Sequence, residues 1–120
     1  MVDTTKLEEE ASGFLAVGQP DKALAVLAPQ IEQNTENVAF LEVLGETLLE
    51  NDQVENAFQV FVRACQLDSE VDFGADKYFY AGQIIGGAEG IAYINQGLAK
   101  LQMRLQRTID NQLGLDPVIV

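Results

Sequence analysis

Three glutamates stand at four-residue intervals along one stretch of the chain, at Glu42, Glu46 and Glu50. On a helix this spacing places three carboxylates on one face, where each like-charge pair costs roughly 0.2–0.5 kcal/mol. No base lies between Lys22 and Arg63 to offset them, although that stretch holds seven acids. A cationic ligand would relieve the repulsion, so the pattern predicts a binding surface for positive charge. The alternative is a solvated face whose charges are simply tolerated.

The residue types that catalysis needs are scarce. The chain has no histidine, which removes imidazole catalysis and histidine metal ligation. The single cysteine, Cys65, has no imidazole to activate it and no partner for an internal disulfide, which favours a reducing compartment. Gly82, Gly86, Gly87 and Gly90 are not followed by the Gly-Lys-Ser/Thr of a phosphate loop, and the acids lack calcium-loop spacing. We therefore predict a protein that is not an enzyme and that needs no metal or cofactor.

Composition and charge limit the class of partner. The chain has 120 residues, of which 48% are hydrophobic. This length and composition predict a single folded domain over 1–120. Nineteen acids oppose seven bases, and the formal charge of −12 argues against nucleic acid as a partner. No apolar run approaches the ~20 residues that cross a bilayer, so no membrane partner is expected. Residues 1–76 carry sixteen acids and three bases, whereas 77–120 carry three acids and four bases. The first part would attract cationic partners, with solubility as the plainer explanation of its charge.

Apolar residues recur at intervals of three and four residues almost throughout, which predicts an all-α protein. Thr5 followed by Glu8 has the spacing of a capping box at the start of the first helix. Pro29 falls late in the second helix and is expected to bend it, because proline lacks the backbone N–H. The predicted helices span about 5–17, 20–32, 37–50, 54–67, 75–85 and 88–111.

Helical positions also repeat with a period of 34 residues. Ala11 and Gly45 share this spacing, and so do other small or large apolar pairs, namely Leu7 with Leu41, Phe14 with Leu48, Ala23 with Ala57, and Leu27 with Phe61. The chain thus resembles the tetratricopeptide-repeat family, whose helix–turn–helix units have this period. That resemblance implies a superhelix of antiparallel helix pairs, with repeats at about 4–37, 38–71 and 75–107 and a tail at 112–120. The third repeat is irregular, since Gly82 and Gly90 are eight residues apart where Gly45 and Ala57 are twelve apart.

The resemblance also implies a concave groove lined by the first helix of each repeat. Its groove positions are Glu8, Ser12, Glu42, Glu46, Leu49, Glu50, Asp76, Phe79 and Gln83. Family members that hold acidic chaperone tails use lysine, asparagine and arginine at positions that here read Glu8, Ser12, Glu46 and Asp76, so an acidic peptide is excluded. The candidate client-binding residues for a basic segment are Glu8, Glu42, Glu46, Glu50, Asp76, Phe79 and Gln83. Phe79 could stack on arginine, with core packing as the alternative, while Tyr78 and Ile85 are expected in the core.

The stretch from Gly74 to Gly90, GADKYFYAGQIIGGAEG, resembles a narrower family. It is similar to the fungal tetratricopeptide chaperones dedicated to a large-subunit ribosomal protein of the uL-four type, which carry a Lys-Tyr/Phe…Gly-Gln…Gly-Gly signature in this irregular repeat. The resemblance implies capture of a highly basic extension of that ribosomal protein in the cytoplasm, and then delivery to the nucleus. The acidic charge of residues 1–76 fits such a client.

The competing hypothesis is a general repeat scaffold that joins proteins without a basic client. It rests on the last predicted helix, which is longer than one repeat requires. The apolar face of this helix must cover either the end of the array or a partner. Its apolar positions are Ile91, Ile94, Leu98, Leu101, Leu105 and Ile109. Self-association through 91–109 is one form of this hypothesis.

Overall fold

The computed structural model describes residues 3–114, which form six α-helices and a short 3₁₀ helix with no strand in that range. The prediction of an all-helical chain is confirmed, and most helix ends lie within a residue of those expected. The division into repeats stays a prediction, and residues 115–120 of the predicted tail lie outside the described residues. The helices are α1 Thr5–Ala16, α2 Pro20–Leu27, η1 Ala28–Gln30, α3 Val38–Glu50, α4 Val54–Leu67, α5 Asp76–Ile85 and α6 Gly87–Gln112.

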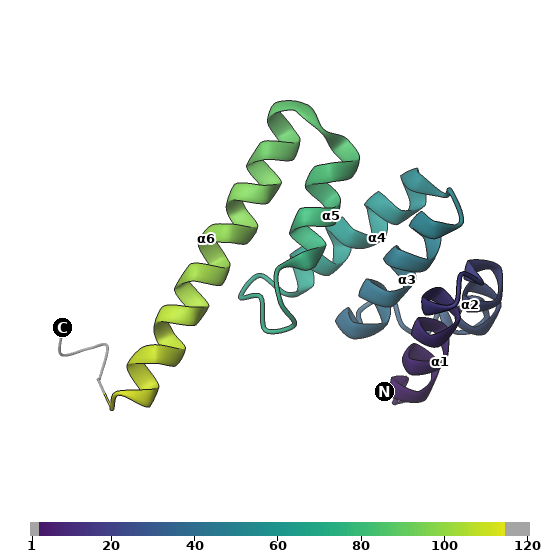
Figure 1. Ribbon diagram of the computed structural model, residues 1–120, viewed down its shortest axis with the longest axis horizontal. Coiled ribbons are helices and arrows are strands. Elements are labelled where there is room, and N and C mark those ends of the chain that lie inside the picture. Colours follow the sequence, from purple (N-terminus) through teal and green to yellow (C-terminus); the bar gives the residue numbers. More distant parts are fainter. Residues whose placement is uncertain (1–2, 115–120) are drawn as a thin grey trace.

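Consecutive helices lie side by side in chain order, from α1 and α2 at one end of the molecule to α6 at the other (Figure 1). Residues related by the 34-residue period are buried together in the main core, including Ala23 with Ala57 and Leu27 with Phe61. At Gly45 an added Cβ would lie 2.6 Å from the Phe61 ring, so glycine here makes room for a large core side chain. The repeated small and large positions therefore pack against one another.

Two expectations about the first two helices differ from the structure. α2 stops at Leu27, about five residues before the expected end, and tightens into the 3₁₀ helix that contains Pro29, whose missing N–H disfavours a continued α-helix. The capping box is wrong. Thr5 is the first residue of α1 and its hydroxyl donates to Asp3, while Glu8 accepts a hydrogen bond from the Thr4 hydroxyl instead.

A tight reversal at Gly86, with Gly87 already the first residue of α6, joins α5 to α6. Gly86 and Gly87 have φ of 67° and 61°, in the region that favours glycine, and α6 begins at once. Tyr78 is buried as expected, at 4% exposure, but the core assignment of Ile85 is wrong. Ile85 is 40% exposed because α5 ends there and the chain turns away before another helix covers it.

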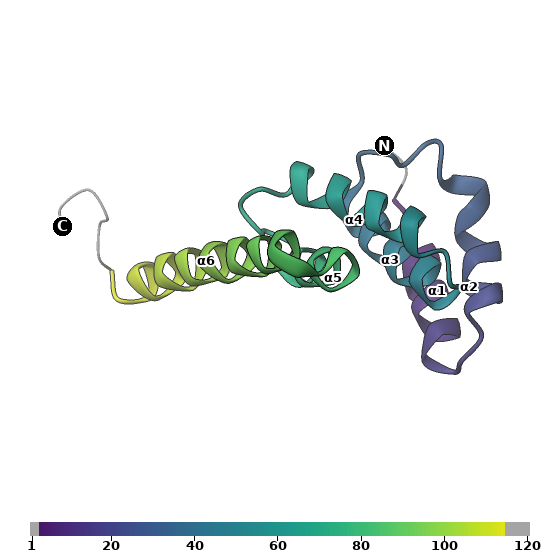
Figure 2. The ribbon, with the colours of Figure 1, turned by 90° about the horizontal axis from the view of Figure 1, so that it is seen from above.

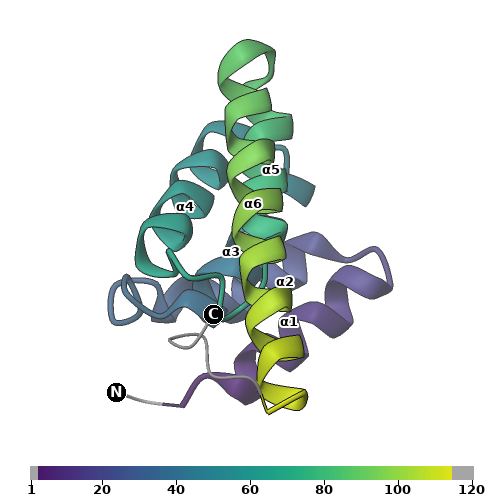
Figure 3. The same ribbon diagram turned by 90° about the vertical axis from the view of Figure 1, so that its left-hand side faces the viewer.

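α6 extends far past α5, as the views from above and from the side show (Figure 2, Figure 3). Its 26 residues span about 39 Å, whereas the 10 residues of α5 span about 15 Å. Lys100 donates to the Ser69 carbonyl at 2.9 Å, and two ion pairs also join α6 to the α4–α5 loop, Arg104 with Asp72 at 2.6 Å and Arg107 with Glu70 at 3.1 Å. The outer apolar residues of α6 stay exposed, among them Ile91, Leu98, Leu105 and Ile109.

Candidate functional site

The acidic face, as we name it, consists of Glu42, Glu46 and Glu50 on α3 together with Asp76 on α5. The three glutamates lie in the 13-residue helix that begins at Val38, where the Asn37 side chain accepts the Phe40 N–H and caps the first turn. Two helices from different parts of the sequence therefore contribute carboxylates to one surface.

Aromatic packing joins α5 to α4, the helix that packs on α3. The Tyr80 ring stacks on the Phe61 ring with centroids 4.7 Å apart and planes 5° apart, and Phe61 fills the space over Gly45. Tyr80 therefore fixes one turn of α5 against α4, and its hydroxyl reaches Glu46 of α3. Asp76, four residues earlier on α5, is carried to the same side.

The surroundings of Glu42 and Glu46 favour the protonated forms of these two side chains. Burial raises the pKa of Glu42 to about 7; Lys77 opposes the rise, while Asp68, Asp76 and Glu46 add to it. Burial likewise raises the pKa of Glu46, against a hydrogen bond from the Tyr80 hydroxyl that lowers it. Because Asp76 also raises the pKa of Glu46, the carboxylates of α3 and α5 act on one another directly.

A buried lysine lies beneath the acidic face. The Lys77 side chain is fully buried, and its Nζ lies 2.6 Å from Asp68 Oδ2 and 3.9 Å from Glu42 Oε2. It also donates to the Gly74 carbonyl at 2.6 Å. The sequence predicted no base near the three glutamates, so this partial compensation of Glu42 is a correction.

Beside these acids lies an open pocket of about 310 Å³, lined by Asp76, Phe79, Tyr80 and Gln83 of α5. Three of the four were sequence-predicted client-binding residues, and the structure brings them together. Phe79 is half-buried, and part of its ring meets Gly97 of α6, so packing accounts for some of its surface. The pocket combines a carboxylate, aromatic rings and an amide, which are groups that suit a guanidinium or ammonium ion.

Glu8 belongs to a different polar network. It lies on α1 and accepts from Thr4, whose hydroxyl in turn accepts from the Asn37 side chain at 2.9 Å. Glu8 thus helps to join the start of α1 to the start of α3, which is a structural role that sequence reasoning did not assign.

Sequence reasoning also missed Tyr80 and Lys77 as parts of the site. A signal for Tyr80 existed, since it stands four residues after Asp76 and therefore on the same helix face. Lys77 had no such signal, because a lysine beside Asp76 would ordinarily be solvated.

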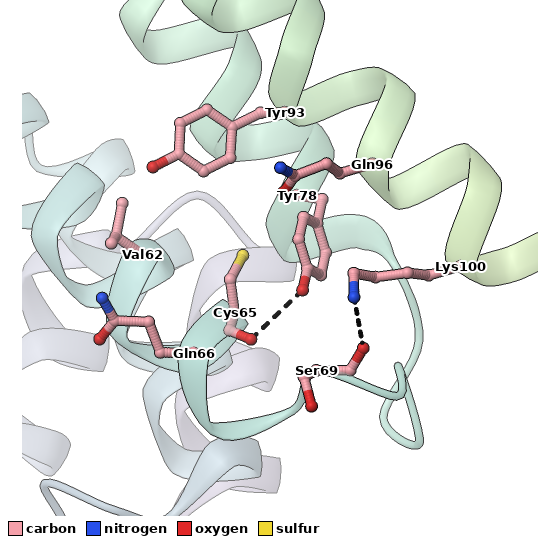
Figure 4. Close-up of a pocket in the computed structure, with 8 residues that line it drawn as sticks. All are labelled: Val62, Cys65, Gln66, Ser69, Tyr78, Tyr93, Gln96 and Lys100. Atoms are coloured by element: carbon pink, nitrogen blue, oxygen red, sulfur yellow. Dashed lines mark hydrogen bonds between the residues drawn. The ribbon is translucent and has the colours of Figure 1, made fainter.

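A larger cavity, of about 460 Å³, opens between α4 and α6 (Figure 4). The Tyr78 hydroxyl donates to the Cys65 carbonyl at 3.3 Å in its wall. Burial raises the pKa of the Cys65 thiol to about 12, so the thiol is protonated and is no nucleophile at neutral pH. Among the described residues, no carboxylate lines this cavity. The lining residues are Val62, Cys65, Gln66, Ser69, Tyr78, Tyr93, Gln96 and Lys100.

Two further kinds of site are absent from residues 3–114. No group of three or more potential metal ligands gathers in that range. None of the helices described there has the length and apolar character to span a bilayer.

Among curated proteins, the chain is similar to a protein of Emericella nidulans described as "Probable assembly chaperone of rpl4". The two are 26% identical over 118 residues, a match that covers 88% of this chain and 31% of the relative. The chain thus spans about a third of that protein's length. No protein-family model matches the chain, and no solved structure matches it significantly. The similarity supports the resemblance to ribosomal-protein assembly chaperones, and the relative's description is that of a chaperone rather than an enzyme.

Proposed function

We propose that this chain binds and shields a basic segment of a ribosomal protein during ribosome assembly, with the acidic face as its binding surface. The observation that carries the proposal is that α3 and α5 present four carboxylates on one surface, while the nearest lysine, Lys77, is buried beneath it. RNA-binding extensions are rich in lysine and arginine, because those side chains contact phosphates. The similarity to the Emericella nidulans protein supports a ribosomal client.

The same proposal includes the architecture and the place of action. The paired helices and the 34-residue period support a tetratricopeptide superhelix with the acidic face in its concave groove. A client of this kind is captured in the cytoplasm and released in the nucleus, so the protein would be found in both. No catalytic step, cofactor or metal is part of the proposal.

A charge-neutral variant of α3 tests it. Changing Glu42, Glu46 and Glu50 together to glutamine should weaken binding of a lysine- and arginine-rich ribosomal-protein peptide roughly tenfold to a hundredfold, at about 0.5–1 kcal/mol for each lost charge contact. The dependence of affinity on salt should become shallower, because fewer ions are displaced. Fluorescence anisotropy at low and physiological salt measures both quantities.

The matched control removes the same number of charges elsewhere. Glu9→Gln, Glu32→Gln and Glu55→Gln together change three exposed acids outside the acidic face. This control should bind nearly as tightly as the parent, with both variants keeping the parent's helical circular dichroism. Equal weakening by the two triple variants would mean that overall charge, and not the acidic face, attracts the peptide.

A second candidate function is a scaffold that associates through α6. The observation that favours it is the row of exposed apolar residues at Ile91, Leu98, Leu105 and Ile109, which are between 46% and 61% exposed. Residues at these intervals lie along one side of a helix, as in helix–helix interfaces. Isolated exposed apolar residues are ordinary, but a continuous row is not.

Association through α6 predicts a dimer that forms almost independently of salt. Leu98→Glu with Leu105→Glu should then convert it to a monomer at the same concentration, because charges would have to be buried in the interface. Sedimentation equilibrium from micromolar to near-millimolar protein measures the mass. A parent chain that stays monomeric throughout that range would rule out self-association through α6.

A further inference from the structure

Glu42 shares one buried cation with a stronger partner. Lys77 lies 2.6 Å from Asp68 and 3.9 Å from Glu42, and the longer separation exceeds hydrogen-bond distance. Asp68 also accepts the backbone N–H groups of Asp72 at 2.8 Å and Phe73 at 2.9 Å. Three donors therefore fix the Asp68 carboxylate, which is the principal counter-ion of Lys77. Glu42 is left with only part of a positive charge.

Negative charges outnumber positive charges around Glu42. Asp76 and Lys77 face it from α5, Asp68 from the loop after α4, and Glu46 from its own helix. This makes four carboxylates around one ammonium group that Asp68 already pairs. Glu42 is also half-buried, so water screens its charge only partly. Among these four carboxylates, ionised Glu42 would therefore be stabilised most by a further cation.

We propose that Glu42 carries a proton in the free protein and loses it when a basic segment binds the acidic face, so that client binding is coupled to proton release. The inference rests on the function proposed above and assigns that site its pH dependence. A lysine or arginine placed over Glu42 supplies the cation that Lys77 does not fully provide. The proton goes to the solvent, and the ionised carboxylate then pairs with the client.

The direction of the pH effect follows from this linkage. Burial raises the pKa of Glu42 to about 7 in the free protein, and a bound cation lowers it. The complex therefore holds fewer protons than the free protein below pH 7, so affinity rises with pH there and levels off above it. Lowering the pH from 7.5 to 6 should weaken binding about fivefold. The chain has no histidine, which is the usual source of proton exchange in this range.

Calorimetry with an acetylated and amidated lysine/arginine peptide that lacks histidine tests the coupling. Titrations at pH 6.5 in buffers of different ionisation enthalpy should show release of a fraction of a proton per peptide. Glu42→Gln should abolish most of that release and flatten the pH profile. The control Glu50→Gln changes an exposed carboxylate on the same helix and should weaken binding while keeping the release.

Each outcome is decisive. Peptide binding without proton exchange would overturn the coupling and leave the proposed function standing, whereas absence of binding at low salt would overturn both. Titration of ¹³C-labelled glutamate carboxyls in the free protein gives an answer without any client. A Glu42 midpoint near 7 supports the coupling, and a midpoint near the ordinary value of 4.5 contradicts it.

Discussion

Replacing Lys77 with methionine should lower the free energy of unfolding by about 3–5 kcal/mol, which is the usual cost of removing one partner of a buried ion pair. The Lys77 side chain is fully buried and contacts Asp68 and the Gly74 carbonyl, both at 2.6 Å. Methionine fills a similar volume but leaves Asp68 as a buried, uncompensated carboxylate. Urea denaturation followed by circular dichroism measures the loss, with a lower midpoint and an unchanged slope.

Two further variants separate the charge effect from general damage. Asp68→Asn combined with Lys77→Met removes both charges and should recover more than half of the lost stability, since no buried ion is left unpaired. Lys100→Met also removes a lysine that donates to a loop carbonyl, but that lysine is only half-buried and should cost less than about 1 kcal/mol. If Lys77→Met is no worse than Lys100→Met, the buried pair contributes little to stability.

The contact between Lys77 and Asp68 could not be predicted from the sequence pattern. Asp68 and Lys77 are nine residues apart and meet only because the intervening loop turns back, with Val71 at φ 49° and Gly74 at φ 94°. Nothing in a periodic pattern of apolar residues encodes such a loop. The resemblance over residues 74–90 included Lys77 but assigned it no role, and the structure makes it a buried counter-ion.

Helices and their ends were more accessible to prediction, because their causes are local. The glycine pair at 86–87 permits the reversal before α6, and Pro29 removes a backbone N–H after α2, although α2 ends about five residues earlier than expected. The candidate site was predicted in part. The grouping of Asp76, Phe79 and Gln83 follows from helical spacing, but their nearness to Glu46 depends on Tyr80 stacking on Phe61. Such contacts join distant segments, and spacing alone does not reveal them.

Gly90→Ala should destabilise the protein by about 1–3 kcal/mol or more, because it forces α5 and α6 apart. A Cβ at Gly90 would lie 2.4 Å from the Gly82 carbonyl oxygen, and a Cβ at Gly82 would lie 2.7 Å from the Gly90 carbonyl oxygen. Both obstacles are backbone atoms, which no side-chain rotation can move. Thermal unfolding by circular dichroism should show a lower midpoint, although alanine is the better helix former.

Gly13→Ala is the matched control for Gly90→Ala. Gly13 lies inside α1, where an added Cβ meets nothing within 4 Å, so alanine should raise stability by about 0.5–1 kcal/mol. Opposite signs for the same substitution would isolate the close helix crossing as the cause. Changing Gly82 and Gly90 together should cost less than the sum of the single changes, since one separation of α5 from α6 relieves both clashes. Strictly additive losses would instead mean that the two glycines act independently, and that the crossing is not the shared constraint.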